Sequence, residues 1–242
     1  MPVSAALIPP WFWLEISIMT VSVRGIGWVT KTGYGSVRTG LDQPFAEGEG
    51  IHSLAKRGIF SHPFKNFGRL DGVSRLTVSA VALALQDAGI EYSPADKQDI
   101  GIIGTSREGS LKSDSDYFRD FVENGRTLSR ANLFIYTLPS SALGEAAIHF
   151  GLTGPLLYAA GVTGTLGEPL DIAAGIVVAR EAGRMLVGRI AAEEVMYAVI
   201  EGTQEEGALC TLDEARLIME SAEDISGILR QLYILKVKKG TA

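Results

Sequence analysis

Few side chains in this 242-residue sequence have the types and spacing that chemistry requires. The only histidines are His52, His62 and His149, and Cys210 is the single cysteine. A hydroxyl nucleophile needs an adjacent base, so any candidate hydroxyl must be matched with one of these imidazoles. No base stands near Cys210 in the sequence, which predicts a small buried side chain rather than a nucleophile. One cysteine also excludes an internal disulfide and a thiolate zinc cluster, and it is typical of a cytoplasmic protein.

Two further patterns match known motifs only in part. Residues 104–113 follow a predicted strand, but a phosphate loop carries its lysine directly after the second glycine, and Lys112 is displaced from that position. The segment therefore predicts a loop at the end of a strand, from which Arg107 and Lys112 are candidates to bind a phosphate. Ser140 and Ser141 lack the Gly-x-Ser-x-Gly frame of a nucleophile elbow, and we expect them to cap a helix.

The composition is that of an apolar, mildly acidic globular chain. Hydrophobic residues make up 46% of the sequence, the mean hydropathy is +0.19 and the formal net charge is −6. A chain this apolar can bury a substantial core, which argues against disorder. Because it has no dense run of Lys and Arg, it lacks the electrostatic signature of a nucleic-acid-binding protein.

The first 20 residues are apolar but do not fit a membrane anchor. Pro9 and Pro10 interrupt the run, no basic region precedes it, and it is too short to span a bilayer as a helix. We interpret residues 1–20 as an apolar arm that packs on the body or on a neighbouring subunit. We interpret residues 21–205 as one domain, because no polar linker interrupts them, and residues 206–242 as a carboxyl-terminal extension.

Hydrophobic periodicity predicts alternating strands and helices. Residues 16–23 fit a strand that ends in a tight turn at Gly25 and Gly27, and residues 31–69 fit a long excursion with little regular structure. Buried strands are predicted at 99–104, 155–160 and 185–191, and helices at 71–88, 113–123, 138–150 and 168–182. This order predicts an α/β fold with a parallel sheet covered on both faces. In the second helix we expect Tyr117, Phe118 and Phe121 on the buried side.

The order of these segments resembles that of the β-ketoacyl synthases. The similar segments are residues 23–30, 71–76, 85–89, 99–105, 138–142, 149–155 and 185–194, and together they cover roughly residues 20–200. No single segment is specific, but their order and spacing are. The resemblance implies the amino-terminal half of a thiolase-type fold, with a mainly parallel five-stranded sheet and helices on both faces.

Family members carry a nucleophilic cysteine at a strand-to-helix elbow, which corresponds here to residues 161–165. Thr163 stands at the cysteine position, with Gly164 and Thr165 beside it as candidate binding residues. A thiol near a helix N-terminus can ionise near neutral pH, whereas a threonine hydroxyl needs a base. The family takes its catalytic histidines from the second half of the fold, and this sequence has no histidine after His149.

The helix after the elbow departs from the family pattern as well. Pro169 lies six residues past Thr163 and would cost about 3 kcal/mol inside a helix that began at the elbow. The sequence instead favours a helix that begins about a turn later, with Pro169 at its first position and Glu168 or a neighbour as its cap. Its positive end would then not point at Thr163, and the Glu168 carboxylate would partly cancel it.

Parts of the carboxyl-terminal region stay open. Residues 206–212 weakly resemble the crossover strand that begins the family's second half, whereas Thr211 and Glu214 match a capping box that opens a helix. Residues 228–237 fit either a helix or a strand. In the family, the acidic residue at the Glu193-Glu194 position is buried and structural, and we interpret this pair in the same way.

These departures predict a catalytically degenerate β-ketoacyl synthase-like protein. It would be a non-catalytic partner or structural subunit in fatty-acid or polyketide-type biosynthesis. One alternative is an acyltransferase of the 3-oxoacyl-carrier-protein synthase type that uses Thr163 or residues supplied by a partner. Another is a module that binds acyl chains, acyl carrier protein or coenzyme A. No cofactor or metal is implied.

In the family, the strand before the nucleophile pairs antiparallel with its copy across a two-fold axis. The equivalent strand here is short and apolar, and an exposed edge of this kind invites aggregation unless it is paired. We therefore expect a homodimer, or a heterodimer with an active ketosynthase, and acyl carrier protein as a further partner. The expected dimer strand consists of Leu156, Leu157, Tyr158, Ala159 and Ala160.

Overall fold

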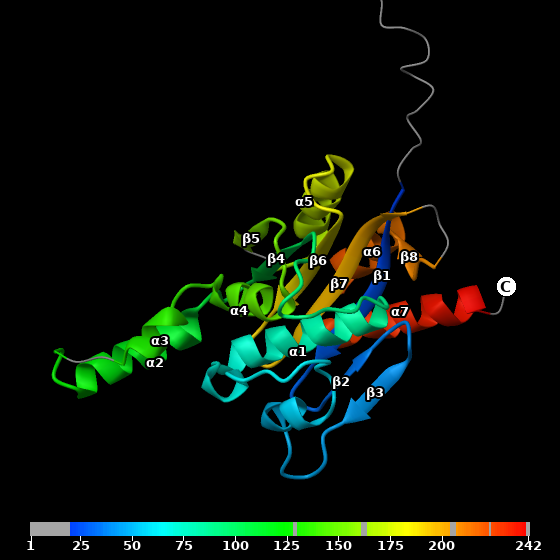
Figure 1. Cartoon of the computed structure of the whole chain (residues 1–242). Helices are drawn as coiled ribbons and strands as arrows, with labels where there is room; N and C mark the ends of the chain where they lie inside the picture. Colours follow the sequence, from blue (N-terminus) through cyan, green and yellow to red (C-terminus); the bar gives the residue numbers. More distant parts are fainter. Residues whose placement is uncertain (1–19, 128–129, 161–163, 204–206, 223, 241–242) are drawn as a thin grey trace, which may run out of the picture.

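The computed structural model describes residues 20–127, 130–160, 164–203, 207–222 and 224–240, so the arm predicted at residues 1–20 lies outside them except for its last residue. The described strands form one sheet, with helices on both of its faces (Figure 1). The strands are β1 (Thr20–Val29), β2 (Gly33–Ser36), β3 (Leu41–Pro44), β4 (Ile100–Ser106), β5 (Leu156–Ala160), β6 (Arg184–Ile190), β7 (Val195–Thr203) and β8 (Cys210–Thr211). The helices are α1 (Gly72–Asp87), α2 (Leu111–Glu123), α3 (Ala131–Ile135), α4 (Ser141–Phe150), α5 (Gly167–Val178), α6 (Leu212–Ser221) and α7 (Ile225–Gly240), with short 3-10 helices at Ile51–Lys56 and Phe67–Arg69.

The sheet is mixed, and most of its strand pairs are antiparallel. Its order is β3-β2-β1-β7-β6-β4-β5, with β8 beside β1, and the parallel pairs are those of β4 with β5 and with β6. The α/β class is confirmed, but the prediction of a mainly parallel five-stranded sheet is wrong, because the described residues form eight strands. The turns after β1 and after β6 are short and return the chain antiparallel, which needs no crossover helix.

The strands that the sequence analysis missed lie around β1. Within residues 31–69, expected to have little regular structure, the chain forms β2 and β3, whose sequences GYGS and LDQP are not apolar runs. Strand β7, with the sequence VMYAVIEGT, lies between β1 and β6 in the sheet. Strands β2 and β7 give β1 a partner on each side.

Helix α1 packs directly against β1, and two glycines permit the close approach. A side chain at Gly25 or Gly27 would overlap backbone atoms of Ala88 or Ala84. Both glycines lie inside β1, which continues to Val29, so the tight turn predicted at this position is wrong. Glycine in a strand often marks a site where another backbone comes close, and that is its role here.

A buried carboxylate at the end of α1 secures the same contact. Asp87 is 2% exposed, and it accepts backbone hydrogen bonds from Ile26 at 2.8 Å, Arg38 at 2.9 Å and Thr39 at 2.8 Å. Hydrogen bonds to charged groups stabilise a fold by about 1.5–3 kcal/mol each. Asp87 therefore joins α1 both to β1 and to the turn after β2.

The two faces of the sheet carry separate cores. Helices α1 and α4 cover one face, whereas α5, α6 and α7 cover the other. The predicted capping box is present, since the Thr211 side chain accepts the Glu214 N–H at 3.2 Å and the Glu214 carboxylate accepts the Thr211 N–H at 2.9 Å. Residues 228–237 are helical, within α7. None of the helices in the described part is long and apolar enough to cross a membrane.

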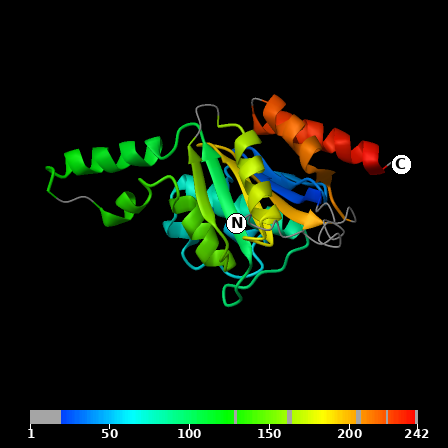
Figure 2. The ribbon, with the colours of Figure 1, turned by 90° about the horizontal axis from the view of Figure 1, so that it is seen from above.

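Helices α2 and α3 form an arm that projects from the body in both views (Figures 1 and 2). The rings of Tyr117 and Phe134 join the two helices, with centroids 5.6 Å apart. The prediction that Phe118 lies on the buried side of its helix is wrong, because its side chain is 65% exposed. The buried residue of α2 is Asp120, which the Arg130 guanidinium binds through two contacts of 2.8 Å.

Replacing Gly27 by alanine should lower the free energy of unfolding by more than about 2 kcal/mol, because the added methyl group would push α1 away from β1. Urea denaturation followed by circular dichroism measures this change. Gly175→Ala is the matched control, since no heavy atom lies within 4 Å of the Cβ position of Gly175 in α5. Alanine there should leave stability unchanged or raise it by up to about 1 kcal/mol. Equal effects at the two positions would contradict the close packing of α1 on β1.

Candidate functional site

The site expected from the sequence lies where β4 and β5 end. The two strands are parallel, and Ser106 pairs with Ala160 at their carboxyl ends. In α/β sheets, ligands usually bind outside the carboxyl ends of parallel strands. Thr163 lies outside the described residues, so the described part of the site consists of the loop after β4 and the segment from Gly164 onward.

Ser106 shapes the loop that follows β4. Its hydroxyl accepts hydrogen bonds from the backbone N–H groups of Glu108 at 3.1 Å and Gly109 at 3.0 Å. The loop places Arg107 against Gly164, where an added Cβ atom would lie 3.0 Å from the Arg107 nitrogen. Gly164 has a φ of +60°, in the left-handed region that favours glycine. The structure thus brings together two of the predicted binding residues.

The remaining two predicted binding residues differ in their surroundings. Thr165 directly follows Gly164 and is half-buried. Lys112 lies exposed in the first turn of α2, where its ammonium group binds the Asp116 carboxylate at 2.7 Å. The hydrogen bond from Lys112 lowers the pKa of Asp116. The charge of Lys112 is therefore engaged on its own helix.

Helix α5 begins at Gly167, four positions after Thr163, which confirms the predicted late start. Pro169 is the third residue of the helix rather than the first, still within the first turn, where backbone N–H groups have no intrahelical partner. Glu168 is exposed in the same turn, and its carboxylate offsets the positive end of the helix dipole. This helix start therefore gives little stabilisation to an anion.

His149 is placed away from this edge of the sheet. His149 lies near the end of α4. Two residues later, the carbonyl of Gly151 accepts a hydrogen bond from the Gln98 N–H at 2.8 Å, and Gln98 lies just before β4 begins. This contact places His149 at the amino ends of β4 and β5, and a five-residue strand spans about 16 Å. His52 lies before α1, where its Nδ1 is 2.8 Å from the Arg75 guanidinium.

His149 belongs to an aromatic cluster on the α1 and α4 side of the sheet. Its ring stacks on Phe64, with centroids 4.0 Å apart and planes at 19°. Burial, followed by the charge of His62, lowers the pKa of His149 to about 4. His149 is therefore neutral at neutral pH and packs as a core side chain.

Cys210 is a core residue, as the sequence predicts. It lies in β8 opposite Val23 of β1 and has no exposed surface. Burial, followed by the charge of Glu214, raises the pKa of the Cys210 thiol to about 12. In the described residues, no group of three or more His, Cys, Asp or Glu side chains is placed to hold a metal ion.

The acidic pair at positions 193 and 194 differs from the expectation of a buried, structural carboxylate. The side chain of Glu193 is 68% exposed and binds Lys31 at 3.1 Å, so that interpretation is wrong for Glu193. The buried acid of this region is Glu201 on β7, which binds Arg24 at 2.9 Å and Arg184 at 2.6 Å across neighbouring strands. The sequence analysis missed this residue because it missed β7.

The expected dimer strand is the last strand of the sheet. β5 follows β4 at the end of the strand order, and its pairing among the described residues is with β4 alone. Leu156 and Leu157 are 39% and 38% exposed. One edge of β5 is therefore free to pair with a further strand.

No protein-family model and no curated protein matches the sequence, whereas solved structures match the fold. The ishigamide ketosynthase/chain length factor has a TM-score of 0.57 and 20% identity, over 78% of this chain and 63% of that chain. The ketosynthase ApeO in complex with its chain length factor ApeC, from Xenorhabdus doucetiae, has a TM-score of 0.52 and 12% identity, over 77% of this chain and 80% of that chain. A β-ketoacyl synthase from Burkholderia phymatum STM815 has a TM-score of 0.55 and 15% identity, over 76% of this chain and 59% of that chain.

The chain therefore has the fold of the β-ketoacyl synthases, and the resemblance inferred from the sequence is confirmed at the level of fold. It spans less than two thirds of the first and third of these structures. At identities this low the likeness establishes the fold and not the roles of individual residues.

The thiol of Cys210 should not react with a thiol reagent such as dithionitrobenzoate in the native protein at pH 8, because burial holds its pKa near 12. In guanidinium chloride one thiol per chain should react rapidly, which serves as the internal control. Fast, stoichiometric reaction of the native protein would contradict the burial of Cys210.

The protein should lose stability as the pH falls from 6.5 toward 4, because His149 takes up a proton in the unfolded chain before it does so in the folded one. We expect this residue to contribute a loss on the order of 1–2 kcal/mol between pH 7 and pH 5. The measurement is urea denaturation at both pH values for the native sequence and for His149→Phe. The variant should show the smaller pH dependence, and an equal dependence in both proteins would contradict this account.

Proposed function

We propose that this protein is a non-catalytic ketosynthase-like subunit that works with a second chain of the same fold in fatty-acid or polyketide-type biosynthesis. The observation that carries the proposal is the start of α5. The helix begins at Gly167, after Thr163, and carries the Glu168 carboxylate in its first turn.

This start matters because a nucleophile at the elbow depends on its electrostatic surroundings. A helix N-terminus lowers the pKa of an adjacent thiol and stabilises a developing oxyanion. Thr163 has a hydroxyl group of far higher pKa, and the first turn of α5 carries the exposed Glu168 carboxylate. Acyl transfer from such a residue would need a base that lies close to it.

Neither His149 nor Cys210 is placed to supply such a base or a replacement nucleophile. His149 lies at the opposite ends of β4 and β5 and is packed against Phe64. Cys210 lies in β8, fully buried beside β1. The proposal therefore assigns the fold a role in assembly rather than in chemistry.

Two of the similar structures contain a chain length factor beside a ketosynthase, which supports a paired role for this chain. We expect pairing through the free edge of β5, with a copy of this chain or with an active ketosynthase. Acyl carrier protein is a further expected partner, and Arg107 beside Gly164 is the group we expect to meet its phosphate. The single cysteine favours a cytoplasmic location.

Incubation of the protein with an acyl-coenzyme A, followed by intact-mass measurement, should show no acyl adduct. The same experiment with Thr163→Ala is the matched control, and both proteins should keep their unmodified mass. An adduct that forms on the native sequence and disappears in Thr163→Ala would contradict the proposal and favour the acyltransferase alternative.

A Thr163→Cys variant tests the effect of the helix start separately. The pKa of its thiol should lie near the ordinary value of about 8.5.

A further inference from the structure

A cavity of about 410 Å³ lies between α4 and the loop before α1. One wall is the loop at residues 62–66, and another is formed by Glu145, Ile148 and His149 of α4. These three residues are spaced i, i+3 and i+4, so they lie on one face of the helix. Pro94, in the segment after α1, also lines the cavity. The volume lies within the range of about 300–1,000 Å³ that is typical of small-molecule sites.

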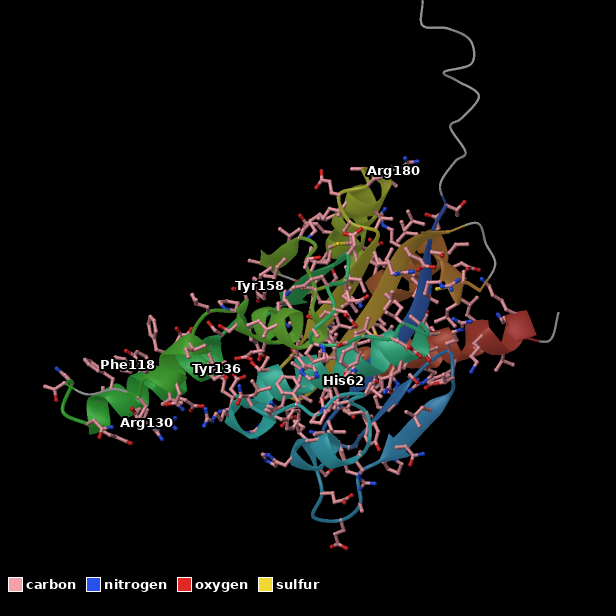
Figure 3. All side chains as sticks on the ribbon, viewed as in Figure 1. His62, Phe118, Arg130, Tyr136, Tyr158 and Arg180 are labelled. Carbon is pink, nitrogen blue, oxygen red and sulfur yellow. The ribbon has the colours of Figure 1, made fainter. Side chains whose placement is uncertain are left out.

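This cavity is separate from the candidate site at the carboxyl ends of β4 and β5. His149 lies at the amino ends of these strands, as the hydrogen bond between Gln98 and Gly151 shows. His62, on the loop before α1, lies in the body of the molecule, well away from the projecting arm that carries Phe118 (Figure 3). Binding of a ligand in this cavity would therefore be independent of the proposed function.

The walls of the cavity offer aromatic and apolar surfaces to a ligand. Phe64 is half-buried, and its ring stacks on that of His149 with centroids 4.0 Å apart. The ring of His62 packs against Tyr92, with centroids 5.6 Å apart. Ile148 has the largest exposed fraction, 78%, of the large apolar side chains in the described residues. A flat aromatic ligand can pack on such side chains and would remove Ile148 from water.

One polar atom in the wall has no partner. His149 is 7% exposed, and its Nε2 atom is buried without a hydrogen-bond partner among the described residues. Buried polar atoms are usually paired, because leaving one unpaired destabilises the protein. Burial lowers the pKa of His149 to about 4, so the imidazole is neutral at pH 7 and has one N–H and one bare nitrogen. A hydroxyl group both donates and accepts, so it can pair with Nε2 in either tautomer.

The charges that line the cavity favour an uncharged ligand. Lys65 is exposed on the loop, and Glu145 lies on α4, where its carboxylate accepts a hydrogen bond from the Tyr136 hydroxyl at 3.5 Å. A ligand of either charge would therefore meet a like charge as well as an opposite one, whereas a neutral ligand meets no repulsion.

We propose that this cavity binds a small, uncharged aromatic molecule that carries a hydroxyl group, such as a phenol or a naphthol. The ring of the ligand lies against Pro94 and Ile148, and its hydroxyl group forms a hydrogen bond with Nε2 of His149. The Phe64 ring stacks on the imidazole and is itself partly exposed, so a turn of this ring opens the path to Nε2.

Equilibrium dialysis of the full chain with 2-naphthol tests this proposal. The matched probe is 2-methylnaphthalene, in which a methyl group replaces the hydroxyl group. The native sequence should bind 2-naphthol at one site per chain. His149→Phe keeps an aromatic ring but removes Nε2, so it should weaken the binding of 2-naphthol about tenfold and leave that of 2-methylnaphthalene unchanged.

Ile148→Glu is a second variant, at an exposed position where folding is not at risk, and it should weaken the binding of both probes about tenfold or more. Leu217→Glu is the matched control, because Leu217 is also a helical apolar residue and is 72% exposed on α6. This control should bind both probes like the native sequence.

A native chain that binds neither probe would overturn the proposal. An equal loss of both probes in His149→Phe would remove the hydrogen bond on which it depends. Unchanged binding of 2-naphthol by a folded Ile148→Glu protein would place the ligand outside this cavity, and would overturn the proposal even if His149→Phe failed to fold.

Discussion

The rest of the structure depends on the close approach of α1 to β1. Gly25 and Gly27 remove the side chains that would separate the helix from the strand, and Asp87 accepts three backbone hydrogen bonds across the contact. Because β1 also pairs with β2, β7 and β8, this contact fixes the position of the whole antiparallel side of the sheet. A buried carboxylate that lost some of its hydrogen-bond partners would raise the free energy of the folded state. The three hydrogen bonds to Asp87 therefore make this arrangement specific as well as stable.

Helices pack on both faces of the sheet around β1, whereas β5 lies at the edge of the sheet. On the covered side, both faces are packed by helices, and strands flank β1. At the other end, β5 has a free edge, and the chain before it extends into an arm whose apolar side chains face solvent. At the candidate site, which lies at the carboxyl ends of β4 and β5, Arg107 lies beside Gly164. The first turn of α5, which follows, carries the Glu168 carboxylate. In the described residues, His149 and Cys210, a potential base and a potential nucleophile, are both buried away from this site.

The sequence predicted the parts of the fold that follow from local periodicity. The helical periodicity of α1, the capping box at Thr211 and the late start of α5 are each determined within a few residues. The parts it missed depend on partners distant in the chain. Half of the residues of strand β2 are glycine, and the two glycines of β1 make room for a helix that lies far away in sequence. Glu201 is buried because two arginines of other strands bind it. For the same reason, periodicity placed Phe118 on an apolar face but could not say what covers that face.

The central claim is the proposal that this chain, which has a ketosynthase-type fold, pairs with a second chain through the free edge of β5. Hydrogen–deuterium exchange at low and at high protein concentration tests it most directly, because it reports which amides become protected on assembly. The account predicts slower exchange at high concentration in residues 156–160, with no change in α7. Unchanged exchange in residues 156–160, or protection confined to the exposed apolar residues of α7, would contradict it.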